Sequence, residues 1–248
     1  PFYFKGSLDD GSFMSVTRDG ELEYSTCKRL PVVGSYDSRL HIRSIDFDAD
    51  GNTTEIELTG NPVKFLQGHN LFGSSDLLNL IYETVLKMAV ILSAPQPRNV
   101  LEQLRSGYYT VSRVDINRMF SLGNRAEVLS FINTMASNSR TKAQATVMKG
   151  QTVYFNKSSK RWSIKMYSKG QESNLPRNKK AGGFLIPPEL LNWADNKMRM
   201  ELTLKSNELR ETGLHLASKW RNIEESDLFT DYAERIQMAA QKKINNLN

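Results

Sequence analysis

The stretch KRWSIKMYSKG, residues 160–170, alternates between apolar and polar residues and indicates a β-strand. In a strand, Trp162, Ile164 and Met166 would lie on one face, because successive side chains point to opposite sides. The other face would carry one tyrosine in a row of mostly cationic residues, namely Arg161, Ser163, Lys165, Tyr167 and Lys169. The function of the chain depends on what this tyrosine meets.

Cationic residues are concentrated around this strand. Residues 140–180 contain 11 Lys and Arg but one acid, Glu172, so the net charge of +6 divides into +10 in this block and −4 elsewhere. Such a block predicts a polyanionic partner, with nucleic acid as the first candidate, although a solvated basic loop is the alternative. Aromatic residues among the cations favour single-stranded nucleic acid, whose bases are unstacked: Tyr154, Phe155, Trp162 and Tyr167. The candidate DNA-binding cations are Arg113, Lys142, Lys149, Lys157, Lys160, Arg161 and Lys165.

Composition excludes several classes of protein. The chain is 39% hydrophobic and 24% charged, which is typical of a globular protein. No apolar run reaches about 18 residues, so we expect no membrane partner. The single cysteine, Cys27, excludes an internal disulfide and a Cys-rich zinc site, and fits a reducing cytoplasm. No G-x-x-x-x-G-K-[ST] motif occurs, so we expect any helicase activity to come from a host partner.

Strand-like and helix-like patterns are mixed without regular alternation, which predicts an α+β fold. We expect a mainly antiparallel sheet with helices on one face and an open polar face on the other. Residues 1–248 would form one domain, with 1–50 as an N-terminal hairpin extension and 206–248 as C-terminal helices. The expected strands are 38–47, 53–59, 108–120, 152–156, 161–169 and 197–205. The expected helices are 76–93, 99–106, 124–137, 187–195, 206–220 and 226–245. Residues 61–70 would be extended, and 138–150 and 171–187 would be loops.

Several of these segments turn ionisable groups away from their apolar face. If helices cover the apolar side, the open side gathers carboxylate, imidazole and amide donors from Glu57, Gln67, His69, Asp115 and Glu201. These donors suit Mg²⁺ or Mn²⁺. A metal beside a basic groove can polarise a phosphodiester, and a tyrosine hydroxyl can attack phosphorus to form a phosphotyrosine. Neighbouring cations would favour the phenolate form of Tyr167.

Each of these residues also has a simpler explanation. An outward-facing acid on an antiparallel strand is usually just solvated, and Arg113 or Arg199 could pair with the acid beside it. His69 could cap the helix that follows, and Tyr167 could be a packed surface aromatic. Taken alone, the residues indicate a nucleic-acid binder, and a metal dependence is an additional hypothesis.

Four segments carry a resemblance to a known family. GNPVKFLQGHNLFGSSDL (60–77) resembles the LQGHN-x-FG segment of the filamentous-phage gene II/X replication initiators. YTVSRVDI is similar to their S-R-[IV]-D strand, and the hairpin that starts at TVYFN ends in their Y-x-K motif. MRMELTLKSNELRETGL is similar to their R-x-E strand and the helix after it. Order and approximate spacing agree over residues 55–215.

The resemblance implies a rolling-circle replication initiator related to the HUH endonucleases, with a ferredoxin-like antiparallel sheet and a metal on its open face. The nucleophile would be Tyr167 of Y-x-K, with Lys169 helping to hold the phosphate. Two departures matter: Gln67-Gly68-His69 replaces the usual His-hydrophobe-His pair, and Y-S-K replaces the Y-x-x-K of many relatives. Among the metal ligands, Asp115, Glu201 and His69 therefore rank ahead of Glu57 and Gln67.

The resulting hypothesis is a site-specific single-strand endonuclease and strand transferase. It would nick a single-stranded, melted or hairpin plus-strand origin, leave a 5′-phosphotyrosine and a free 3′-OH, and rejoin the strand. We expect it to work in the cytoplasm of a bacterial host with host helicase and polymerase. The alternatives are a non-catalytic origin-binding regulator, a metal-dependent nuclease that uses water, and a protein–protein adaptor. Tyr154, on the paired strand, could be a second catalytic tyrosine or could pack in the core.

Overall fold

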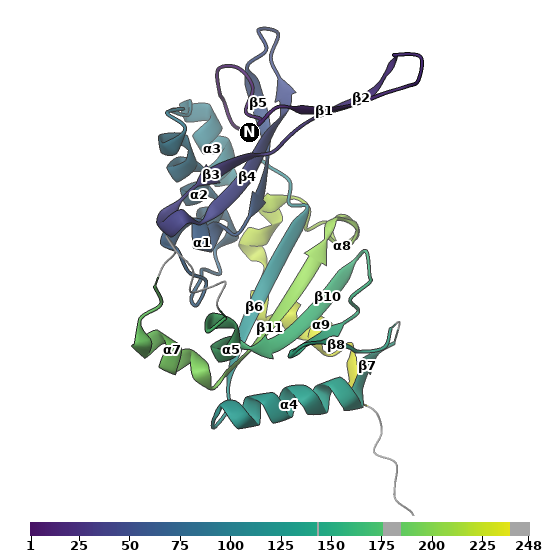
Figure 1. The fold of residues 1–248 in the computed structure, drawn as a ribbon. Coiled ribbons are helices and arrows are strands. Elements are labelled where there is room, and N and C mark those ends of the chain that lie inside the picture. Colours follow the sequence, from purple (N-terminus) through teal and green to yellow (C-terminus); the bar gives the residue numbers. More distant parts are fainter. Residues whose placement is uncertain (143, 176–184, 239–248) are drawn as a thin grey trace, which may run out of the picture. The chain divides into compact units, whose positions relative to one another are not determined.

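The computed structural model describes residues 1–142, 144–175 and 185–238 (Figure 1). Helices and strands are mixed, which confirms the predicted α+β class. The chain divides into two compact units. The first contains residues 1–110 and 216–221, and the second contains the described residues of 111–179, 185–215 and 222–248. Each unit is considered by itself below, and a single functional domain stays a prediction.

In the first unit, helices pack against a three-stranded antiparallel sheet of order β3-β4-β5. The β4–β5 hairpin was predicted from its Asp-Gly turn. The core contains residues of the sheet and helices alike, including Leu40, Ile42, Phe65 and Met88. The strands are β3 (Leu30–Val33), β4 (Arg39–Phe47) and β5 (Thr53–Gly60), and a separate hairpin comprises β1 (Ser12–Val16) and β2 (Leu22–Cys27). The helices are η1 (Ser35–Asp37), α1 (Pro62–Gln67), α2 (Leu77–Ile91), α3 (Arg98–Ser106) and η2 (Ala217–Asn222).

The prediction of an extended segment at residues 61–70 is wrong, because α1 occupies most of it. The Asn61 side chain caps this helix by accepting a hydrogen bond from the Lys64 backbone N–H at 3.0 Å. Pro62 lies in the first turn, where its missing N–H costs nothing. Gly68 then ends the helix in the left-handed conformation, at φ 86°. Gln67 is therefore the last residue of a helix.

The second unit is built on a five-stranded sheet of order β6-β11-β10-β9-β8 in which every neighbouring pair is antiparallel. Its strands are β6 (Arg113–Ser121), β8 (Val147–Lys149), β9 (Thr152–Phe155), β10 (Trp162–Ser168) and β11 (Lys197–Lys205). Its helices are α4 (Arg125–Asn138), α5 (Lys169–Ser173), α7 (Pro188–Asp195), α8 (Ser206–Glu211) and α9 (Glu225–Ala233). The series β6, α4, β9, β10, α5/α7, β11 has the β-α-β-β-α-β element order of ferredoxin-like folds.

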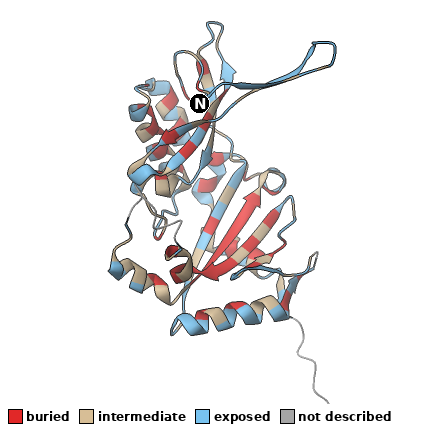
Figure 2. Ribbon diagram, in the orientation of Figure 1, coloured by how far each residue is buried: buried red, intermediate tan, exposed pale blue. Residues whose placement is uncertain are grey.

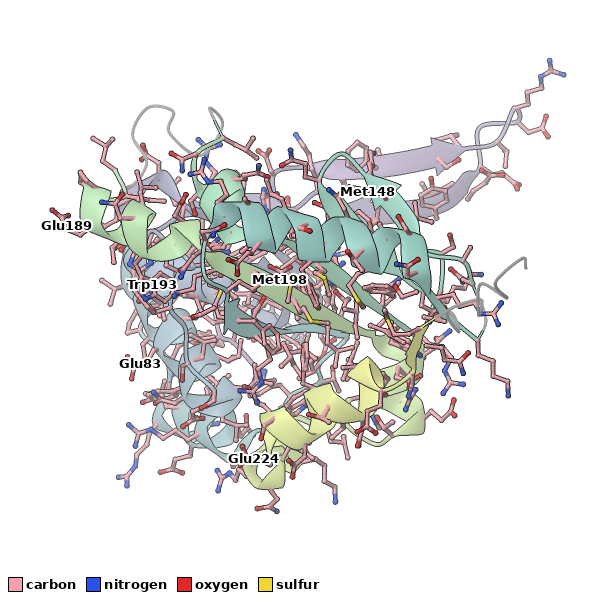
Figure 3. All side chains as sticks on the ribbon, turned by 90° about the horizontal axis from the view of Figure 1, so that it is seen from below. Glu83, Met148, Glu189, Trp193, Met198 and Glu224 are labelled. Atoms are coloured by element: carbon pink, nitrogen blue, oxygen red, sulfur yellow. The ribbon has the colours of Figure 1, made fainter. Side chains whose placement is uncertain are left out.

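The apolar face of this sheet is the one that the alternating sequence predicted. Ile164 and Met166 of β10 and Leu202 of β11 are fully or almost fully buried (Figure 2). Helix α4 packs on this side against β9, β10 and β11, and Figure 3 shows it running across the sheet beside Met198. Helix α9 also reaches this side, where the rings of Tyr232 and Trp162 meet edge to face at 5.4 Å.

The C-terminal part of the unit differs from the prediction of two long helices. Helix α8 ends at Glu211, and Gly213 follows with φ 76°. Helix α9 ends at Ala233, and the chain then forms β12 (Ile236–Met238), which pairs with β7 (Ser139–Thr141). Strands β7 and β8 therefore occupy the segment 138–150 that was expected to be a loop. Residues 239–245 of the second expected helix, and 176–184 of the loop expected at 171–187, lie outside the described residues.

Two smaller corrections concern element boundaries. The strand expected to begin at residue 108 begins at Arg113, and Lys169 starts helix α5 rather than ending strand β10. No helix in the described ranges has the length and hydropathy needed to cross a bilayer.

Candidate active site

The polar face of the second unit brings side chains from three adjacent strands together. Residue pairing places Lys165 of β10 opposite Glu201 of β11, and Glu201 opposite Asn117 of β6. One step along the sheet, Tyr167 lies opposite Arg199, and in the other direction Thr203 lies opposite Asp115. Because directly paired residues point to the same side of a sheet, these groups share one face.

The phenol of Tyr167 contacts a carboxylate. Its hydroxyl donates a hydrogen bond of 2.6 Å to Oε1 of Glu201. The same carboxylate forms ion pairs with Lys165, through its other oxygen, and with Arg199, whose Nε lies 3.3 Å from Oε1. One hydroxyl and two cations thus converge on a single carboxylate, as expected for a buried acid that must be paired.

This cluster is not open to solvent at its centre. The exposed fractions are 9% for Tyr167 and 7% for Glu201, whereas the Lys165 side chain is 38% exposed. The expectation of an open polar face is therefore wrong for the middle of the sheet, where the polar side chains pack on one another. It holds better along β6, where the Arg113 and Asp115 side chains remain well exposed.

Tyr167 has a raised pKa. Burial disfavours the charged phenolate, the neighbouring charge of Glu201 raises the pKa further, and the opposing effect of Arg199 is too small to reverse this. The expectation that cations favour the phenolate is therefore wrong, because burial and the carboxylate among the cations have the larger effect. Tyr167 is a neutral phenol at ordinary pH, so any reaction through its oxygen requires a proton acceptor.

Asp115 lies on the same face but in a different set of contacts. Its carboxylate accepts a 2.7 Å hydrogen bond from the Thr203 hydroxyl and pairs with Arg113 at 3.2 Å. Asn117 lies between the two acids in the register, and its Oδ1 accepts a hydrogen bond of 3.1 Å from Arg199 Nε. The simpler expectation that Arg113 and Arg199 pair with neighbouring acids is therefore confirmed for both.

Lys169 is located just after Tyr167, at the start of α5. The Ser168 side chain caps this helix, and Lys169 is 1% exposed with its Nζ 2.6 Å from Glu172. Gly170 packs against the backbone of α7, where an added Cβ would lie 2.7 Å from the Asp195 Cα. Lys169 is therefore a buried, ion-paired residue that fixes α5 beside the tyrosine.

The other three candidate ligands belong to the first unit. Glu57 forms ion pairs with Arg43 at 2.6 Å and Arg29 at 3.1 Å. The Gln67 amide donates to the backbone carbonyl of Phe72 at 2.9 Å and more weakly to that of His69, and His69 Nδ1 accepts from the Leu71 N–H at 3.4 Å. Gln67 and His69 do not share a strand face, because α1 replaces the strand.

The candidate ligands do not gather into a metal site within either unit as described. In the described part of the chain, no three His, Cys, Asp or Glu side chains lie together as metal ligands would. Glu57 and Glu201 are each bound by two cations, and Asp115 by one. The donor set splits between units, with Asp115 and Glu201 in the second and Glu57, Gln67 and His69 in the first.

The predicted DNA-binding cations separate into two groups. Arg161 is bound to Glu208 and Glu211 beside α8, so its charge is already balanced. Arg113 and Lys165 are likewise ion-paired. The others are exposed and, among the described residues, have no acid within ion-pair distance: Lys142, Lys149, Lys157 and Lys160. Arg177, Lys179 and Lys180 of the cationic block lie outside the described residues.

The contact between Tyr167 and Glu201 was not foreseen from the sequence. The alternation of β10 and β11 placed both residues on polar faces, but pairing of the two strands was needed to place them one register step apart. The same pairing separates the aromatics of the cationic block. Phe155 and Trp162 are buried on the apolar face, whereas Tyr154 is partly exposed on the polar face with Tyr167.

Known proteins that are similar to this chain are phage replication proteins. Residues 1–223 match the family described as the N-terminal part of the phage "Replication-associated protein". The chain is 37% identical over 237 residues to the replication-associated protein of Enterobacteria phage I2-2, which covers 94% of this chain and 68% of that protein. It is 27% identical over 177 residues to the proteins of the same description in phages M13 and f1, covering 65% of this chain and 42% of each of theirs. No solved structure matches the chain.

Proposed function

The chain belongs to the phage replication-associated protein family, whose N-terminal part it matches, and from this premise we propose that it initiates phage DNA replication by nicking one strand of the origin. Family membership supports a role in replication. The exposed lysines around β8 and β9 support contact with DNA, since cations bind its phosphates independently of sequence. The contact between Tyr167 and Glu201 supports the nicking chemistry.

In the proposed reaction, the Tyr167 hydroxyl oxygen attacks a phosphorus atom of the strand. A bond forms between this oxygen and phosphorus while the bond from phosphorus to the 3′ oxygen breaks. Glu201 takes the phenolic proton, and a proton goes to the departing 3′ oxygen. The products are a 5′-phosphotyrosine and a free 3′-OH, and the reverse reaction rejoins a strand without an external energy source.

The observation that carries this proposal is the 2.6 Å hydrogen bond from the phenol to a buried carboxylate. A neutral phenol is a weak nucleophile, and an adjacent base is the usual means of activating one. Glu201 is already within the distance that a general base requires. Lys165 and Arg199, on the same carboxylate, would face the phosphate and offset its negative charge.

Two expected roles are refined by this geometry. The family resemblance assigns Lys169 to the phosphate, but its ion pair with Glu172 and its burial favour a positioning role, holding α5 next to Tyr167. Glu201 was a candidate metal ligand, whereas its contact with the phenol favours proton acceptance. A requirement for Mg²⁺ or Mn²⁺ remains a separate proposal that rests on the family resemblance, and chelation with EDTA tests it directly.

The test uses single-stranded oligonucleotides that tile the replicon encoding this chain, incubated with protein and Mn²⁺ and resolved on a denaturing gel. Wild type and the control variant Tyr154→Phe should give a protein–DNA adduct, and Tyr167→Phe should give none. An adduct that persists in Tyr167→Phe contradicts the nucleophile. Cleavage without an adduct indicates a nuclease that uses water, and binding without cleavage indicates an origin-binding regulator.

The proposal extends to the setting of the reaction. A host polymerase would extend the free 3′-OH, and a host helicase would open the duplex ahead of it. Both partners, and the bacterial cytoplasm as the place of action, follow from the family resemblance. Addition of host extract and labelled nucleotides to the nicked product would show whether the 3′ end is extended.

A further inference from the structure

Tyr154 is an aromatic residue of the polar face to which the proposed reaction gives no role. It lies on β9, opposite Lys165 of β10 on one side and Val147 of β8 on the other. Its side chain is partly exposed, and Nζ of Lys157 lies 4.7 Å from the centre of its ring. It therefore does not pack in the core, which was one of the two explanations open for it.

The register places this ring close to the proposed nucleophile. Tyr154 pairs with Lys165, and Tyr167 is two residues further along the same strand and on the same face. Such diagonal neighbours are about 7–8 Å apart in a sheet. That distance is about two base steps at the duplex rise of about 3.4 Å, and fewer in a stretched single strand. A strand whose phosphate meets Tyr167 would bring an adjacent base to Tyr154.

Cations flank the same ring. Lys149 pairs with Thr152 in the register, which puts it on the polar face one step from Tyr154. Lys149 and Lys157 are exposed and, within the described residues, no acid lies within ion-pair distance of either. Proteins that bind single strands combine aromatic platforms for bases with cations for the backbone. The β8–β9 edge of the sheet presents this combination.

We propose that Tyr154 is a stacking platform for an unpaired base next to the scissile phosphate, with Lys149 and Lys157 contacting neighbouring phosphates. The ligand class is single-stranded DNA, because a base inside a duplex has no free ring face to offer. This inference rests on the proposed nicking function for its position along the strand. It also assigns Tyr154 a binding role in place of that of a second nucleophile.

Binding is measured by fluorescence anisotropy with a labelled single-stranded oligonucleotide and with the matching duplex, in EDTA so that no strand is cut. Tyr154→Ala should weaken single-strand binding roughly 5- to 150-fold, the range found when a stacking ring is removed. Duplex binding should stay close to wild type. Tyr154→Phe and Tyr154→Trp should bind single strands as wild type does, because both keep a ring.

Salt dependence separates the ring from the charges. Lys149→Gln is the matched control, and it should reduce the slope of log affinity against log salt by about 0.7, the value for one phosphate contact on a single strand. Tyr154→Ala should leave this slope unchanged. As a measurement on the unaltered protein, irradiation of a strand carrying 5-iodouracil, followed by peptide mass spectrometry, should identify Tyr154 as a crosslinked residue.

The proposal is overturned if Tyr154→Ala binds single strands as wild type does, or if it loses duplex binding equally. It is also overturned if Tyr154→Phe is as weak as Tyr154→Ala, since the hydroxyl would then matter, or if no crosslink forms at Tyr154. The outcome is independent of nicking. Stacking can hold in a wild type that forms no adduct, and a wild type that forms the Tyr167 adduct can still lack the stacking effect.

Discussion

Replacing Glu201 with glutamine tests the proposed proton transfer more directly than removing the tyrosine does. The amide is nearly the same size as the carboxylate and keeps one oxygen that can accept the 2.6 Å hydrogen bond from Tyr167. It cannot take up the phenolic proton, however, and it no longer neutralises Lys165 and Arg199. The substitution therefore removes the base while the phenol stays in place.

The expected loss follows from the role assigned to the carboxylate. A positioned general base contributes about 10²- to 10⁴-fold to rate, or about 2.7–5.5 kcal/mol of barrier. Binding of DNA should not weaken, because the variant loses a negative charge beside the phosphate site. The loss should therefore appear in the single-turnover rate of adduct formation. Removing the carboxylate charge also lowers the pKa of Tyr167 towards its usual value, so the residual rate should rise with pH.

The assay is a single-turnover time course at several Mn²⁺ concentrations, with Glu211→Gln as control. Glu211 contributes the same charge to the same unit but pairs with Arg161 beside α8. If Glu201 is the proton acceptor, the Mn²⁺ concentration for half-maximal rate stays unchanged as the rate falls. A rate in Glu201→Gln equal to that of the control refutes the reasoning. A rate restored by high Mn²⁺ would instead make Glu201 a metal ligand.

Three further predictions concern stability, measured by urea unfolding. Asn61→Ala should lower the free energy of unfolding by about 1 kcal/mol, because it removes the cap of α1; an unchanged midpoint would contradict this. Gly170→Ala should cost about 1–3 kcal/mol through the contact with Asp195, and its adduct rate should fall because α5 shifts beside Tyr167. Burial alone would raise the pKa of Glu208, but bonds from Tyr232 and Arg161 lower it overall. Glu208→Gln should therefore cost about 2 kcal/mol at pH 7, and this difference should shrink as pH falls below about 4.3, where the unfolded carboxyl is protonated; a constant difference would contradict the assignment.

The second unit was largely predictable from sequence because its strands alternate. β10 and β11 each carry an apolar row that must be buried, and this requirement fixes which side chains share the polar face. Helices α4 and α7 were predicted close to their observed bounds, since each begins with a recognisable start signal: Asn124 as a cap and Pro188 in the first turn. Local patterns of this kind are independent of the rest of the fold.

The remainder depended on contacts that sequence does not contain. The segment that holds Gln67 and His69 was expected to be extended, but the cap at Asn61 makes it a helix. The state of Tyr167 depended on the balance between burial, one carboxylate and the surrounding cations, and counting cations along the strand gave the wrong sign. The expected set of five metal ligands assumed a common surface, whereas the residues fall in two units.

The path of the chain determines how this protein can be dissected. Residues 216–221 belong with the first unit although they lie between segments of the second. There the Ala217 N–H donates to the Tyr109 carbonyl at 3.1 Å, Trp220 is buried, and Arg221 bonds to the Arg105 carbonyl at 2.6 Å. A fragment ending at residue 110 would lose these partners, and the complementary fragment would expose the indole. Expression of the halves by a single cut should therefore yield poorly folded pieces, and grafting 216–221 onto the first half is the rational repair.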